Sequence, residues 1–304
     1  MEDIFSLFGK SLKEMGKSPV LLIAGFVVGA LALPLLAGYG ETSETIRSIA
    51  VDFSQFFVPL LILPFIGGGA LGYAIEVREK GASSPSTFIA SATKYYPKMI
   101  MGGIIAFIVY YIITAGSLMF VLAGLMADPF LGSMLGFLAV ALAFLILMAI
   151  EFYDISIVAD NAGVIAAFQN SIDFTRRNLA RVVVFFIIVL VFKALIQMPL
   201  SFGMAGAMMA NDTYYNALMA ASNASFNNST AAATNSTLNL TSLLSMESFT
   251  LSPVALAVVG FFQVLLQGFV FALLTLFKTE VYLTTKNRRK ITDFDYDFSD
   301  EKMA

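Results

Sequence analysis

The side chain with the clearest potential for chemistry is Lys193, which lies inside an apolar run at residues 182–200. A charge in hydrocarbon costs at least about 2.5–3.5 kcal/mol, so an ionisable residue there indicates function by default. Gln197 lies four residues further on, on the same helix face, and Gln263 and Gln267 form a second such pair in another apolar run. These four side chains could line a polar path between two membrane-spanning helices. The alternative is structural: Lys193 extends to the membrane surface, and the glutamines hydrogen-bond between helices.

Three carboxylates, Glu151, Asp154 and Asp160, follow a third apolar run. Three carboxylates near a membrane face could hold a cation or relay a proton. The alternative is that they pair with arginines that follow in the sequence: Arg176, Arg177 and Arg181.

The residue types that are missing exclude much catalytic chemistry. The chain has no Cys and no His, which removes disulfides, Cys/His zinc sites, haem held by His and every nucleophile–His triad. Asp293, Asp295 and Asp297 imitate the start of a calcium-binding loop, but Phe298 stands where that loop requires Gly. We therefore expect no enzyme, no cofactor and no metal site. The net charge of −3 gives no basic footprint for nucleic acid.

Every Asn-x-Ser/Thr sequon lies in one polar stretch, residues 207–251, which also lacks Lys and Arg. N-glycans are added only on the non-cytosolic side of a membrane, so a used sequon would place this loop outside. The alternative is a polar loop that matches the pattern by composition. The candidate glycosylation sites are Asn211, Asn223, Asn227, Asn228, Asn235 and Asn239.

The composition is that of a polytopic membrane protein. The chain is 58% apolar and 13% charged, whereas soluble domains carry about 25% charged residues. We expect an all-α bundle of six membrane-spanning helices, with the last two extending to about 208 and 284. The predicted spans are 19–39, 53–75, 99–126, 132–157, 180–200 and 251–276.

Three amphipathic helices are predicted on the cytosolic face, each before an outward-going span. The first has one apolar face, formed by Ile4, Phe5, Phe8, Leu12 and Met15. The second begins at the start signal Ser84-Pro85 and carries Phe88, Ile89, Ala92 and Tyr95. The third, capped by Asp160 or Asn161, carries Val164, Ile165, Phe168 and Ile172.

A short motif recurs in these helices at a constant spacing of 80 residues: Phe8-x-x-Ser11, Phe88-x-x-Ser91 and Phe168-x-x-Ser171. We interpret the chain as three copies of one unit, namely interfacial helix, span out, loop and span in. The units cover residues 1–77, 78–158 and 159–285, and residues 286–304 form a charged tail. Chance spacing of a common motif is the alternative.

The basic residues orient the molecule. Of the 18 Lys and Arg residues, 16 fall on the predicted cytosolic side, together with both termini. The first 17 residues have no cleavage signal and are expected to be a retained cytosolic N-terminus. We therefore predict a multi-pass protein of the plasma membrane. A basic cluster after the last span is suited to anionic lipid headgroups: Lys286, Arg288, Arg289 and Lys290.

Three functions remain open. The favoured one is a non-enzymatic structural, scaffolding or partner-binding protein that displays the glycosylated loop and forms homo-oligomers or binds other membrane proteins. The second is a small-solute or ion transporter or channel with the polar path described above, and the third is membrane remodelling. Small-xxx-small pairs permit close helix packing, within a subunit or between copies: Gly25/Gly29, Gly68/Gly72 and Gly132/Gly136.

Two segments resemble known sequences. They are Phe8-Gly-Lys-Ser-Leu-Lys-Glu-Met-Gly-Lys-Ser-Pro and Asp154-Ile-Ser-Ile-Val-Ala-Asp-Asn-Ala-Gly, which leads into Phe168-Gln-Asn-Ser. They are similar to uncharacterised prokaryotic, often archaeal, integral membrane domains, which resemble the membrane domain attached to some glycerophosphodiester phosphodiesterases. The resemblance implies six spans and an archaeal source. The chain has no phosphodiesterase catalytic domain, so that activity is not implied.

Overall fold

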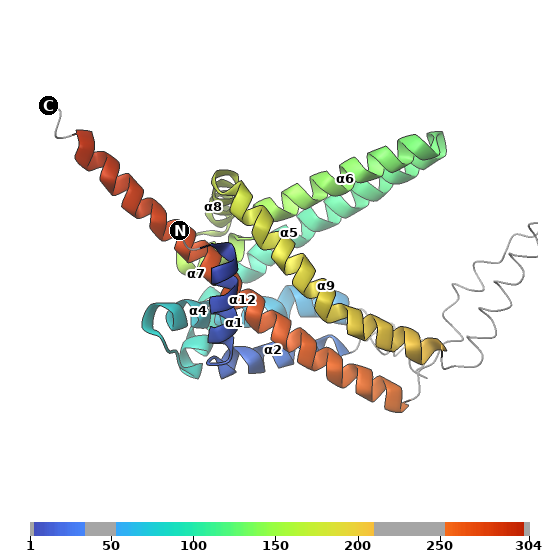
Figure 1. Ribbon diagram of the computed structural model, residues 1–304, viewed down its shortest axis with the longest axis horizontal. Helices are drawn as coiled ribbons and strands as arrows, with labels where there is room; N and C mark the ends of the chain where they lie inside the picture. Colours follow the sequence, from blue (N-terminus) through green and yellow to red (C-terminus); the bar gives the residue numbers. More distant parts are fainter. Residues whose placement is uncertain (1–2, 34–52, 210–252, 301–304) are drawn as a thin grey trace, which may run out of the picture.

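The computed structural model describes residues 3–33, 53–209 and 253–300, and its secondary structure in these ranges is entirely helical (Figure 1). Four helices are long and apolar enough to cross a membrane, and the number rises to six if each of two bent helix pairs counts as one span. The elements are α1 (Ile4–Met15), α2 (Pro19–Leu31), the π-helix η2 (Phe53–Ile62), α4 (Leu63–Lys80), α5 (Pro85–Ala127), α6 (Pro129–Ile150), α7 (Tyr153–Ala159), α8 (Val164–Arg177), α9 (Leu179–Met209) and α12 (Pro253–Asp300).

Two of the predicted amphipathic helices are separate helices that lie across the apolar ones. The chain bends by 91° between α1 and α2 and by 99° between α8 and α9. Pro19 opens α2, where its missing N–H would have had no helical partner in any case. Asn178 alone separates α8 from α9. A polar linker and a helix restart thus produce a right-angled turn before each of these two apolar helices.

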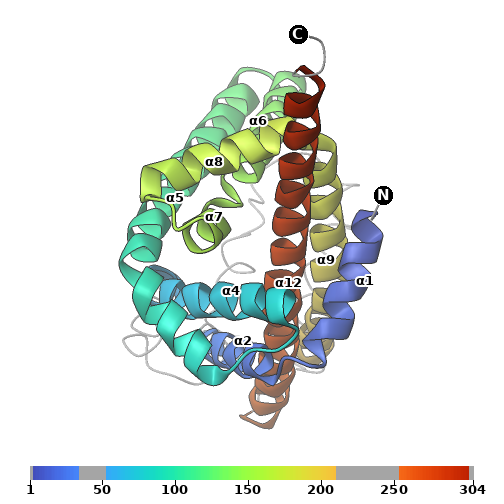
Figure 2. The same cartoon turned by 90° about the vertical axis from the view of Figure 1, so that its left-hand side faces the viewer.

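The second predicted amphipathic helix is not separate, because it forms the first turns of α5. Its predicted start is confirmed: the Ser84 hydroxyl accepts a hydrogen bond from the Thr87 N–H at 3.4 Å. Pro97 lies inside α5 without ending it, and Figure 2 shows α5 as one curved helix. No linker comparable to Gly16 or Asn178 interrupts the helix here, so the chain bends gradually instead of turning sharply.

Two further predictions about helix ends are corrected. The third amphipathic helix begins after Gly163 and is not capped by Asp160 or Asn161. Asn161 instead has a φ of 50°, a left-handed conformation that Asn tolerates better than most residues. The charged tail is not separate from the last span, because α12 continues as a helix to Asp300 (Figure 1).

Backbone contact at glycine joins α2 to α12. A Cβ atom on Gly25 would lie 2.2 Å from the carbonyl oxygen of Gly268, and one on Gly29 would lie 2.6 Å from that of Val264. Such distances are sterically forbidden, so only glycine allows this approach. This small-xxx-small pair therefore packs within the subunit.

The other two glycine pairs also pack within the subunit, in both cases against α5. A Cβ on Gly72 would lie 2.2 Å from the Ser91 hydroxyl oxygen, and Gly68 is in ordinary contact with Tyr95. Gly132 lies opposite Gly124, where an added Cβ would come within 2.7 Å of the Gly132 Cα. The α5–α6 hairpin and the α4–α5 contact thus depend on small side chains.

Each amphipathic segment packs on a helix that belongs to another of the three predicted units. The first turns of α5 pack on α4, α8 packs on α6 and α7, and α1 packs on α12. The chain therefore brings its first and last helices together (Figures 1 and 2). The α5–α6 hairpin extends away from the α9 and α12 helices (Figure 1). The buried face of α1 consists of Ile4, Leu7, Ser11 and Met15, so Phe5 and Leu12 of the predicted apolar face stay exposed.

Candidate functional site

The site begins at a two-residue break between α6 and α7. The end of a helix leaves backbone carbonyl and N–H groups without helical partners. Here two hydroxyls of α8 supply them: Ser171 donates to the Ala149 carbonyl at 2.7 Å and accepts from the Phe152 N–H at 3.0 Å. Thr175 donates to the Met148 carbonyl at 3.1 Å. The break is therefore held by hydroxyls of α8, and the repeated Phe-x-x-Ser motif provides Ser171.

The break turns two carboxylates toward α12. Lys278 contacts the Glu151 Oε1 at 2.9 Å and the Asp154 Oδ1 at 2.8 Å. Its Nζ also lies 5.8 Å from the centre of the Phe152 ring, which is completely buried. The predicted alternative, pairing with arginines, is thus wrong for both acids. Their partner is a lysine on the last helix.

The third predicted carboxylate belongs to a different contact. Asp160 accepts a hydrogen bond from the Tyr282 hydroxyl at 2.7 Å and forms an ion pair with Lys286. Lys286, predicted to bind headgroups, is therefore engaged by a carboxylate. Among the described residues no group of three or more acidic side chains is placed to hold a metal ion.

A second buried ionic contact ties α12 to the start of the chain. Glu280 has a side chain only 1% exposed, and it lies 3.1 Å from the Lys10 Nζ and 3.1 Å from the Arg78 Nε. Arg78 also donates to the Thr284 hydroxyl at 2.7 Å. Glu14 lies nearby, and burial together with the charge of Glu280 raises the pKa of its carboxyl.

Sequence reasoning missed Lys278 and Glu280. Both interrupt an otherwise apolar stretch of α12, as Lys193 interrupts that of α9. The criterion that singled out Lys193 would have selected them too, had it been applied to the predicted extension of the last helix from 276 to about 284. Together with Lys286 they make α12 the helix on which the ionic contacts of this region converge.

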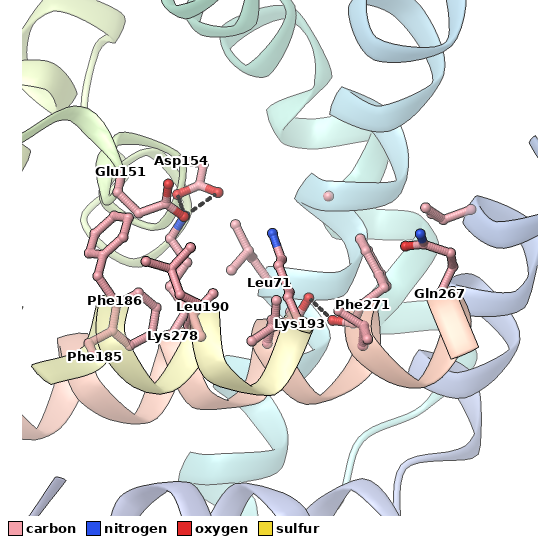
Figure 3. A pocket seen from close by; sticks show the side chains of 16 residues that line it. Leu71, Glu151, Asp154, Phe185, Phe186, Leu190, Lys193, Gln267, Phe271 and Lys278 are labelled. Atoms are coloured by element: carbon pink, nitrogen blue, oxygen red, sulfur yellow. Dashed lines mark hydrogen bonds and ion pairs between the residues drawn. The ribbon is translucent and has the colours of Figure 1, made fainter. Parts of the chain in front are cut away.

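A cavity of about 380 Å³ lies beside the cluster of Lys278, Glu151 and Asp154 (Figure 3). It is bounded by α2, α4, α9 and α12, with the two acids at one end. Most of its wall is apolar. The α9 residues that line it recur every three or four positions, as expected for one face of a helix. The apolar lining residues are Val28, Leu71, Phe185, Phe186, Val189, Leu190, Val270, Phe271 and Leu274.

Part of the predicted polar path lies in this cavity. Lys193 and Gln267 both line it, from α9 and α12 respectively. Figure 3 shows the Lys193 amine directed into the space between the helices. Within the described ranges no ion pair or hydrogen bond engages this amine. Gln263 is half-buried and is not part of the lining, and the side chain of Gln197 lies outside the description.

Other predicted site residues lie where the structure does not describe them. The glycosylation sites, between Asn211 and Asn239, fall in the undescribed segment 210–252. Arg288, Arg289 and Lys290 lie on α12, but their side chains are also outside the description.

Comparison with known proteins gives a family without an assigned activity. A family model described as "Domain of unknown function (DUF7847)" matches residues 3–282, so the chain belongs to that family. No curated protein and no solved structure matches the chain.

Proposed function

We propose that this member of the DUF7847 family binds a small polar solute in the cavity between α2, α4, α9 and α12 and carries it across a membrane. The observation that supports this most is the Lys193 amine, which is directed into the cavity without a described partner. A charge kept in an apolar helix has a high free-energy cost, so it is expected to serve binding. The volume of about 380 Å³ is in the range of small-molecule sites.

The test is solute uptake by the purified protein in liposomes. We expect at least one charged solute from a panel of amino acids, organic acids and amines to be taken up or exchanged. Lys193→Met should abolish that flux while leaving the thermal stability close to that of the parent. Lys13→Met removes one charge from an exposed position on α1 and is the matched control. Flux that persists in Lys193→Met would refute the role of this cavity.

The transport proposal includes a membrane arrangement of six spans with both termini in the cytosol. The right-angled bends before α2 and α9 support it, because they separate two amphipathic helices from two apolar ones. The chain has no native cysteine, so single-cysteine labelling reads topology directly. An impermeant thiol reagent should label Ser222→Cys on intact cells, and label Ala82→Cys only after permeabilisation. The reverse pattern would invert the arrangement.

We also propose that the outer loop is glycosylated and that the protein resides in the plasma membrane of an archaeon. The clustering of all six sequons in one segment supports the first part. The resemblance to archaeal membrane domains supports the second. Mass spectrometry of peptides from the native protein should find glycans on residues between Asn211 and Asn239. Unmodified peptides throughout would reject glycosylation.

Packing equivalences support a threefold repeat as the plan of the chain. Phe8, Phe88 and Phe168 are all half-buried, although they lie in three different helices. Ser91 contacts the backbone at Gly72, and Ser171 bonds that of Phe152, which lies 80 residues after Gly72. We propose that the units are copies of one hairpin, of which the second and third dock through Phe-x-x-Ser, whereas Ser11 of the first bonds the Leu7 carbonyl of its own helix. Exchanging the segment 164–177 for 84–97 should then allow folding, whereas a scrambled segment should not.

A scaffolding role is the second candidate, favoured by the α5–α6 hairpin. In the most apolar stretch of α5 no residue is buried, and in that of α6 only 6% are. Such a hairpin could pack against a second copy of the chain. The mass of the gently solubilised native particle tests this. A stable homo-oligomer that dissociates on Phe137→Ser in α6 would favour scaffolding, and a monomer would reject it.

A further inference from the structure

The cavity proposed above as a transport site carries opposite charges in two places. At one end Glu151 and Asp154 share the single ammonium of Lys278, which leaves one net negative charge. Further along α9, Lys193, an exposed residue, adds a positive charge that no described residue neutralises. The charges of the lining therefore sum to zero, but the negative and the positive charge lie in different places. A ligand that neutralises both places must itself carry two opposite charges.

The two charged places are separated along the helices. Lys193 follows Phe186 by seven residues, roughly 10 Å at 1.5 Å per residue. Figure 3 shows Phe186 beside Glu151, and Lys193 between Lys278 and Gln267. The charged side chains extend into the cavity and shorten the gap that a ligand has to span.

The wall between the charges is apolar. Leu190 of α9 and Leu274 of α12 line the cavity on the side of Lys193 that faces the acids, and Phe271 lies on its other side, toward Gln267 (Figure 3). Hydrocarbon placed there leaves water and is stabilised by about 25 cal/mol per Å² of buried surface. Gln267 lies beyond Phe271, on the side of Lys193 that faces away from the acids (Figure 3).

We infer that the cavity holds a zwitterion, a solute with an anionic group at Lys193, a cationic group at Glu151 and Asp154, and an apolar part between them. The inference rests on the proposed transport function and names its class of solute. The Glu151 side chain at the cation site is 40% exposed. That exposure suits an entry point for a charged solute.

Three probes of one chain length test the inference: ε-aminocaproate, caproate and hexylamine. Binding is measured by calorimetry on the full-length protein in lipid nanodiscs. The zwitterion should bind roughly ten- to a hundredfold more tightly than either singly charged probe, because each end adds one charge-assisted contact. Equal binding of caproate and ε-aminocaproate would reject the cation site and leave an anion site only. No binding of any probe would also overturn the inference.

Two variants test which charged side chain of the cavity binds which charged group of ε-aminocaproate. Lys193→Met should lower the affinity for ε-aminocaproate to that for hexylamine and leave hexylamine binding unchanged. Glu151→Gln should lower it toward that of caproate and leave caproate binding unchanged. Lys13→Met should alter neither affinity. The same loss for all three probes in either variant would point to misfolding of the cavity and contradict the assignment. If another solute shows Lys193-dependent uptake while ε-aminocaproate does not bind, transport stands and only the zwitterion is refuted.

Discussion

The buried carboxylate of Glu280 should be one of the most sensitive positions in the protein. Glu280→Gln keeps the shape of the side chain but removes the charge that faces Lys10 and Arg78, each 3.1 Å away. Removing one partner of a buried ion pair costs about 3–5 kcal/mol, because the remaining charge is buried without compensation. Lys10 is 44% exposed and can turn to water, whereas Arg78 is 17% exposed and cannot. We therefore expect a loss near the lower limit, about 3 kcal/mol.

The assay is equilibrium unfolding in mixed micelles with an increasing fraction of SDS, followed by circular dichroism. Lys80→Met is the matched control, since it breaks a 2.7 Å pair with Glu76 in which the lysine is 69% exposed. An exposed pair of this kind contributes at most about 1 kcal/mol. Replacing Lys10, Arg78 and Glu280 together by Met should recover most of the loss, because an apolar cluster of similar volume is often as stable as the ionic one. A loss for Glu280→Gln no larger than that for Lys80→Met would refute the reasoning.

Three further predictions concern packing, the helix break and pH. Gly25→Ala should destabilise the protein by about 1–3 kcal/mol in the same assay, because the new Cβ meets backbone, whereas Gly9→Ala has open space and should stabilise it by up to about 1 kcal/mol. Ser171→Ala should lower the free energy of unfolding by about 1–3 kcal/mol, because it leaves the buried Phe152 N–H unpaired. The isosteric Ser171→Cys should recover little of this loss. An unchanged stability of Ser171→Ala would contradict this account of the break. Glu14→Gln should raise the melting temperature at neutral pH, because the raised pKa of Glu14 means that its charge destabilises the folded state. This gain in melting temperature should shrink as the pH falls through the raised pKa. A gain that does not depend on pH would refute the role assigned to the Glu14 charge.

Much of the helical layout was predictable because it depends on local signals. The Ser84-Pro85 start, the break before Pro19 and the apolar runs are all properties of neighbouring residues. The membrane class and the all-α fold follow from the same runs. Local signals gave the wrong length for helices that continue without a break before or after the apolar run. Nothing near Lys98 stops α5, and nothing before Asp300 stops α12, so both helices are longer than the apolar runs that revealed them.

The candidate site was predictable only in part, because its contacts join distant parts of the sequence. Lys193 and Gln267 were found through the free-energy cost of polar groups in apolar helices, a local argument. The partner of Glu151 was not, since Lys278 lies 127 residues away and arginines are closer in sequence. Choosing between them requires the direction in which the α6–α7 break turns the carboxylates. That direction is set by hydroxyls on α8, which no pattern in the sequence connects to the break.

The packing of α1 on α12 has a consequence for the order in which the protein can be made. The Lys10–Glu280 contact can form only after Glu280, 270 residues later in the sequence, has been synthesised. At about 5–20 residues per second, that delay is roughly 14–54 s. During this time the buried face of α1 has no α12 to cover it. The α1 helix, synthesised before α12, thus reaches its final place only after α12 has been made, and the interval is a time in which a chaperone or a partner subunit can reach α1.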